Sequence, residues 1–109
     1  MPQVYKQLFA SAPIATTLTD AYTVAAATTA IISSISICNR SATVTTIRLS
    51  HAPLGAVDAV GHYFMYDAQV PANTTLFITG GITLAATDKI RCYVGAATIT
   101  IIGWGEERT

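Results

Sequence analysis

Charged side chains are scarce in this chain of 109 residues. Only 11% of the residues are charged, against about 25% in typical soluble domains, and six basic residues balance six acidic ones. A monomer with few charges and no net charge has little electrostatic protection against association. We therefore expect much of its outer surface to be covered by other subunits.

The chain also lacks a basic patch and a long hydrophobic run. Its Lys and Arg residues are scattered, whereas nucleic-acid binding requires several cations on one face. The most apolar windows, such as AYTVAAATTAII, are interrupted by Thr and are shorter than the ~18 residues of a membrane span. The N-terminus has neither the basic nor the apolar region of a signal peptide. The sequence therefore predicts a protein made in the cytosol, with no nucleic-acid or membrane partner.

Patterns typical of catalytic and metal sites are missing as well. The sequence contains no G-x-S-x-G, H-E-x-x-H or P-loop motif. His51 and His62 flank the segment APLGAVDAVG, but their spacing fits no zinc or calcium pattern. Cys92 is expected to be a buried thiol, while Cys38 lies either facing outward or at a bulge. We expect no enzymatic activity, no metal and no cofactor.

Residues typical of strands dominate instead. Thr, Val and Ile alternate with small polar residues in runs such as TAIISSISICN and ATITIIGW. Turn residues separate the runs, and the two glycines at 80–81 are expected to form a turn. Short strands at this spacing predict an all-β fold, an antiparallel β-sandwich of jelly-roll or immunoglobulin-like type. About eight strands are predicted, near residues 4–9, 20–25, 29–39, 43–51, 61–69, 74–79, 88–94 and 97–105.

The length fits a single domain. We expect the sandwich to span residues 20–105 and a short charged, solvated tail to follow at 106–109. Residues 1–19, which include Phe9, alternate only weakly. They form either an arm that reaches onto a neighbour or an edge strand of their own domain, and both alternatives stay open.

The stretch IISSISICNRSATVTTIRLS, residues 31–50, is interpreted as a hairpin that turns at Asn39–Ser41. Ser and Thr occupy positions where most soluble proteins place Lys and Glu. Because Lys and Glu are depleted in interface cores, we interpret these small polar residues as a subunit contact. The candidate interface residues are Ser34, Ser36, Thr43, Thr45, Thr46 and Arg40 at the turn, with Phe9, Tyr63 and Tyr66.

The aromatic run YFMY, residues 63–66, offers an alternative use of the surface. In a regular strand, alternate residues face opposite sides. Either the first and third residues lie outside while the second and fourth enter the core, or the reverse. The exposed pair suits a subunit interface or a glycan-stacking platform, and we favour the interface because only Asp67 and Gln69 lie near to bind sugar hydroxyls.

Four segments carry a family resemblance. They are a Tyr-Thr-Val opening at Tyr22–Val24, the turn at Asn39–Ser41, a Tyr-x-x-x-Asp strand at Tyr63–Asp67 and an Ile-Thr-Leu-x-x-x-Asp turn at Ile82–Asp88. From about residue 20 to residue 104, the chain resembles small β-sandwich proteins encoded in the structural gene clusters of tailed bacteriophages.

The resemblance implies a virion protein and identifies no functional residue. Such a protein is made in the host cytoplasm, decorates the head as a cement protein or belongs to the tail or baseplate, and packs on other phage structural proteins. We expect a homo-oligomer, a trimer or hexamer. The alternative is a receptor- or glycan-binding module of a tail appendage.

Overall fold

Strands make up 64% of the computed structural model, which describes residues 3–57 and 59–108. Two short 3-10 turns, Pro53–Gly55 and Val60–His62, interrupt them. All pairings between the strands are antiparallel, so the all-β sandwich predicted from the alternation is confirmed. The strands are β1 (Gln3–Ser11), β2 (Thr19–Thr23), β3 (Thr29–Asn39), β4 (Thr45–Ala52), β5 (Tyr63–Val70), β6 (Thr75–Leu84), β7 (Lys89–Val94) and β8 (Ile99–Arg108).

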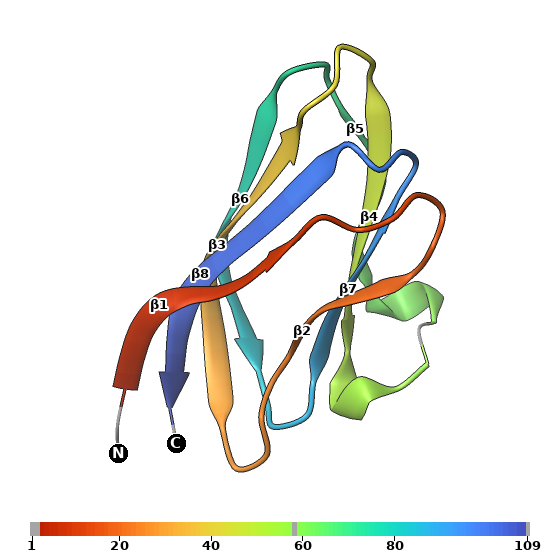
Figure 1. Cartoon of the computed structure of the whole chain (residues 1–109). Helices are drawn as coiled ribbons and strands as arrows, with labels where there is room; N and C mark the ends of the chain where they lie inside the picture. The colour runs from red at the N-terminus through yellow and green to blue at the C-terminus, as the bar shows by residue number, and fades with distance from the viewer. Residues whose placement is uncertain (1–2, 58, 109) are drawn as a thin grey trace.

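The strand order identifies the type of sandwich. One sheet has the order β1-β8-β3-β6 and the other has the order β2-β7-β4-β5, and Figure 1 shows the two sheets facing each other. The first strand pairs with the last, the second with the seventh, the third with the sixth and the fourth with the fifth. This is the order of an eight-stranded jelly roll, and it differs from the immunoglobulin order.

The stretch 31–50 does not form the hairpin expected from the sequence. β3 pairs with β6 and β8, whereas β4 pairs with β5 and β7 of the other sheet. The chain crosses between the sheets just after Asn39, whose side chain is buried. The Asn39 amide donates hydrogen bonds to the carbonyl oxygens of Thr43 (2.8 Å) and Val70 (3.1 Å). Its carbonyl oxygen accepts a hydrogen bond from Thr98 Oγ1 (3.1 Å). Because both strands carry large apolar side chains on one face, the crossing buries both faces in a single core, which a hairpin within one sheet would not do.

Both sheets bury their inner faces in this common core. Full burial of one such aliphatic side chain contributes about 1.5–3 kcal/mol relative to exposure. The largest side chains that are less than 2% exposed are Ile32, Ile35, Ile37, Ile47, Leu49, Leu84, Ile90, Ile99, Ile101, Val24, Val70 and Val94.

Phe9 belongs to the same core and not to a subunit contact. Its side chain is 7% exposed, and its ring stacks on Tyr22 with the ring centroids 5.6 Å apart. The ring occupies space beside Gly103 that a Cβ at that position would overlap. β1 pairs with β8, so residues 3–11 are an edge strand of their own sheet. Residues 1–2 of the expected arm lie outside the described residues.

Residues 106–108 continue β8 and do not form a solvated tail. They pair with both β1 and β3, and residue 109 lies outside the described residues. Glu107 accepts a hydrogen bond from Tyr22 Oη and forms an ion pair with Lys6 Nζ at 3.0 Å. The hydrogen bonds from Tyr22 and Lys6 lower the pKa of Glu107. The Glu107 carboxylate therefore links β8 to β1 through Lys6 and to β2 through Tyr22.

Bulges interrupt the regular alternation of side chains. The register of β3 against both neighbours shifts between Ile32 and Ser34, so Ile32 and Ile35 both face the core. Opposite this point, Gly80 and Gly81 lie inside β6 with φ of 125° and 80°, although the sequence predicted a turn there. Glycine adopts such positive φ values without steric cost, which lets the long strand kink and continue.

We predict that Gly105→Ala destabilises the fold. A Cβ on Gly105 would overlap the carbonyl oxygen of Ile31, and a backbone atom cannot rotate away as a side chain can. The free energy of unfolding in urea should fall by roughly 1–3 kcal/mol. Gly61→Ala is the control, because no atom lies within 4 Å of its Cβ position, and equal stability of the two variants would contradict the prediction.

Candidate functional site

The outer face of the sheet β1-β8-β3-β6 carries almost no charge. β3 and β6 contain no charged residue, and β8 contains none before Glu106. The outward side chains form rows across the strands, and two neighbouring rows are made only of apolar and uncharged polar residues. We call these two rows the uncharged face: Phe77, Ser36, Ile102 and Ala10 in one row, and Thr79, Ser34, Trp104 and Gln7 in the next.

The structure places the predicted Ser, Thr and Arg contacts in different parts of the molecule. Ser34 and Ser36 lie on the uncharged face, where Ser36 is only 7% exposed because it lies between two larger side chains of neighbouring strands. Thr43 and Arg40 are exposed in the crossing between β3 and β4. Thr45 is 8% exposed within its own chain, so it has little surface to offer a partner.

Tyr63 and Tyr66 lie on the outer face of the other sheet. The register of β5 against β4 shifts so that both tyrosines face outward while Met65 packs against the core. Their rings meet edge to face with centroids 5.1 Å apart. The exposure of residues 63–66 follows the second predicted alternative, because Phe64 (40%) and Tyr66 (58%) are exposed whereas Tyr63 and Met65 are half-buried. The register shifts of β5 nevertheless bring the Tyr63 ring against Tyr66.

Arg48 lies at the centre of this second outer face. Its guanidinium carbon is 4.3 Å from the ring centroid of Tyr66 and 4.8 Å from that of Tyr93. The same guanidinium donates hydrogen bonds of 2.6 and 3.2 Å to the Asp67 carboxylate, which lower the pKa of Asp67. Arg48 thus covers one face of the Tyr66 ring, one of the rings of the predicted glycan platform, and one face of the Tyr93 ring.

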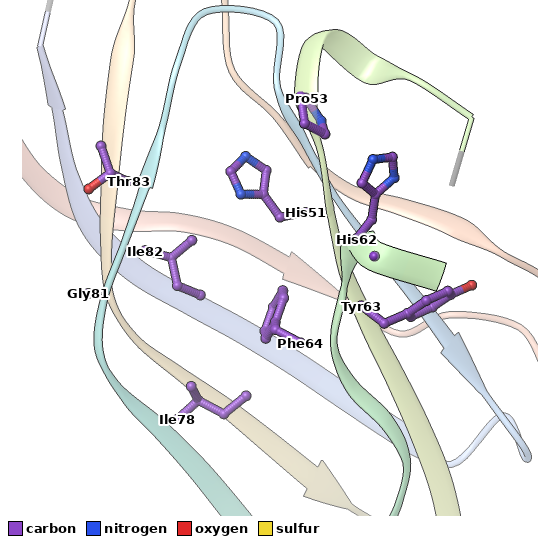
Figure 2. Close-up of a pocket in the computed structure, with 10 residues that line it drawn as sticks. His51, Pro53, His62, Tyr63, Phe64, Ile78, Gly81, Ile82 and Thr83 are labelled. Atoms are coloured by element: carbon purple, nitrogen blue, oxygen red, sulfur yellow. The ribbon is translucent and has the colours of Figure 1, made fainter. Parts of the chain in front are cut away.

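A pocket of about 510 Å³ opens between the sheets beside β5 and β6. Figure 2 shows Phe64, Ile78 and Ile82 grouped on one side of it and His51 and His62 on the other. The two histidines flagged in the sequence therefore line the same pocket.

His51 contacts the buried carboxylate of Asp88. Its Nε2 lies 2.8 Å from Oδ2 of Asp88, which is 6% exposed. Asp88 also accepts hydrogen bonds from the backbone N–H groups of Leu54 (2.9 Å) and Ala85 (3.0 Å). Burial raises the pKa of Asp88, but these three hydrogen bonds outweigh it and hold that pKa below its ordinary value. Asp88 therefore joins the β6–β7 turn to the end of β4.

The described residues contain no cluster of three or more His, Cys, Asp or Glu side chains placed to hold a metal ion. Asp58, which lies between the two histidines in the sequence, is outside the described residues. Both cysteines are free thiols. Cys92 is buried, which raises the pKa of its thiol to about 11, whereas Cys38 lies on the outer side of β3. None of the described helical turns has the length and hydropathy of a membrane-spanning helix.

Comparison with known proteins does not place the chain in a family. No family model, curated protein or solved structure matches it. A functional proposal therefore depends on the surfaces of the chain itself and on the sequence resemblance.

The main surface residues that the sequence interpretation missed are Phe77, Ile102 and Trp104. Large apolar side chains are usually assigned to the core. The alternation already carried the necessary signal, because Phe77 lies between Leu76 and Ile78, which face the core. Phe77 is 67% exposed, so its position in the alternation was a better guide than its hydrophobicity.

We predict that Asp88→Asn weakens the fold at neutral pH. The substitution removes a buried negative charge and places an amide donor among the N–H groups of Leu54 and Ala85. The free energy of unfolding in urea should fall by about 2–3 kcal/mol at pH 7. The exposed variant Asp67→Asn is the control and should have a smaller effect.

The same pair of variants tests the pH dependence. The pKa of Asp88 is lower in the folded than in the unfolded chain, so its contribution is present at neutral pH. That contribution declines as the pH approaches the unfolded-state pKa of about 3.9, and it is lost as the pH falls through the folded-state pKa. The stability difference between wild type and Asp88→Asn should therefore shrink on acidification, and a constant difference down to pH 3 would contradict the assignment.

Proposed function

We propose that this protein is a non-enzymatic structural component of a tailed-bacteriophage virion, which self-associates and packs on capsid or tail proteins. The observation that carries the proposal is the uncharged face. Interface cores are enriched in aromatic residues and depleted in Lys, Glu and Asp, and the uncharged face has this composition. Phe77 and Trp104 supply large apolar area, while Ser34 and Ser36 allow close approach.

The size of this sheet face supports the same proposal. Four strands about 4.8 Å apart, each about ten residues long with a rise of about 3.3 Å per residue, cover roughly 600 Å². A standard protein interface takes about 800 Å² from each partner. The whole outer face of the sheet, of which the uncharged face is the central part, is therefore somewhat smaller than one side of a standard interface.

The phage assignment depends on the sequence resemblance. Eight-stranded jelly rolls occur in viral capsid proteins, but also in lectins and cupins, so the fold alone does not select a function. With the resemblance over residues 20–104, the proposal is a subunit made in the host cytoplasm and incorporated into the head or tail. A homo-oligomer, either a trimer or a hexamer, is the proposed form.

Incorporation into particles tests this proposal. Phage particles would be produced with wild-type protein, with Ile102→Lys or with Gln69→Lys, and the copies per purified particle counted by quantitative gel analysis. A lysine at position 102 places a charge in the middle of the uncharged face, whereas Gln69 is exposed on the opposite sheet. We expect Ile102→Lys to be lost from particles and Gln69→Lys to be retained. Equal incorporation of both variants, or absence of the wild type from virions, would overturn the proposal.

The glycan-binding alternative leads to a different outcome. It requires saturable binding to bacterial surface carbohydrate that is lost in Tyr66→Ala. Because Arg48 already covers one face of the Tyr66 and Tyr93 rings, we expect no such binding in an equilibrium titration with host polysaccharide. Micromolar binding that disappears in Tyr66→Ala, from a protein that stays monomeric, would favour the glycan-binding module.

A further inference from the structure

The four edge strands of the sandwich differ in how well they are protected from pairing with another chain. The edges are β1 and β6 in one sheet and β2 and β5 in the other. An edge strand exposes unpaired backbone N–H and C=O groups, and proteins usually block it with a charge, a bulge or short length. β1 contains Lys6 and a register shift, β2 has five residues and contains Asp20, and β5 contains Asp67 and two register shifts.

β6 is the exception. It has ten residues, Thr75–Leu84, and none of them is charged. Of the strands that the structure describes, only β3 pairs with it, and the register from Thr75 to Thr79 against β3 is regular. Its one irregularity is the kink at residues 80–81. At the centre of the regular part, the large apolar side chain of Phe77 is 67% exposed.

We propose that β6 is a self-association edge, on which the segment Thr75–Thr79 pairs antiparallel with the same segment of a second copy, so that Phe77 lies opposite Phe77 of that copy. This inference rests on the proposed function and specifies how the chain self-associates. The contact joins two four-stranded sheets into one, and it brings two uncharged faces side by side as a single surface.

The segment is complementary to itself in this arrangement. With Phe77 opposite its own copy, Thr75 lies opposite Thr79 of the second chain, and Leu76 lies opposite Ile78. Aromatic pairs and Thr–Thr pairs across antiparallel strands are favourable, whereas like charges directly opposite each other are not. No charge opposes a charge in this register. Because the chain has no net charge, long-range repulsion between two copies is also weak.

The symmetry of the contact restricts the assembly. Two copies of one strand paired antiparallel around their midpoint are related by a two-fold axis, so the interface is isologous. A three-fold ring alone cannot contain such a contact, whereas a hexamer built from three dimers can. Between the trimer and the hexamer expected for this protein, the β6 edge therefore selects the hexamer, with the dimer as its building unit.

A charge-swap experiment at position 77 tests the proposal. Phe77→Lys and Phe77→Glu each place two like charges about 5 Å apart across the two-fold axis. Each variant alone should dissociate to species without the β6 contact, with a dissociation constant raised about tenfold or more in sedimentation velocity. An equimolar mixture of the two variants should regain the association, because Lys then faces Glu. The matched control is Tyr5→Lys on the opposite edge strand, since Tyr5 is 68% exposed and Phe77 is 67% exposed.

The outcomes separate this inference from the proposed function. Even-numbered wild-type oligomers, dissociation of each charged variant and recovery in the mixture support the β6 contact. Oligomers that resist Phe77→Lys, that do not recover in the mixture or that respond equally to Tyr5→Lys overturn the β6 contact while leaving self-association intact. A wild type that is monomeric throughout the micromolar range overturns both the β6 contact and the self-association in the proposed function.

A crosslinking measurement decides the matter if a charged variant folds poorly. In a Cys38→Ser background, Phe77→Cys should form a disulfide-linked dimer on mild oxidation, because residues that face each other across such a ladder lie within disulfide range. Tyr5→Cys in the same background is the control. Equal crosslinking of the two variants, or none at position 77, overturns the β6 contact.

Discussion

Each strand of a two-layered sandwich must give one of its faces to the core, and the rest of this structure depends on that constraint. In β3 and β8 the inward positions are occupied by Ile35, Ile37, Ile99 and Ile101, none of which is exposed. The outward positions do not have to fill the core, so their composition is set by what surrounds the sheet. On one sheet these positions hold Ser, Thr, Phe and Trp, and on the other they hold tyrosines and ion pairs. The two outer faces therefore differ in composition.

On the sheet β1-β8-β3-β6 the few charges gather at one end, where Lys6 pairs with Glu107 and Arg108 pairs with Glu106. Arg48 pairs with Asp67 and Lys89 pairs with Asp20 on the outer side of the sheet β2-β7-β4-β5. Such exposed pairs contribute little to stability, because solvent screens them and long side chains lose entropy on forming them. Their position is more informative than their strength. A sheet face with charges is compatible with water, whereas a broad face without them is better satisfied by protein.

Local periodicity was enough to predict the number of strands, their approximate places and most of the buried residues. It could not predict which strands pair, because the turn residues between two strands do not determine whether the second strand joins the same sheet or the other one. Asn39 looked like a hairpin residue, yet its buried amide holds a crossing between two sheets. Bulges were the second limit, since one extra residue exchanges the two faces of a strand. For this reason the uncharged face was recognised only in part, through Ser34 and Ser36, and the sequence left two alternatives open for the aromatic run at residues 63–66.

An isologous edge contact also explains how a chain so poor in charge can avoid unlimited aggregation. A sheet that stacks on neighbours by two different edges can grow without end, whereas an edge that pairs with its own copy is consumed by one partner. After two β6 strands have paired, the edges that remain in the joined sheet are the two copies of β1, each of which contains Lys6 and a bulge. Further strand addition is then blocked, and growth must proceed through the outer face. Because the outer face and the edge are different surfaces of the sheet, the two contacts can be formed independently. In the proposed arrangement, the β6 contact therefore closes the dimer and leaves the uncharged face available for the contacts that build the hexamer.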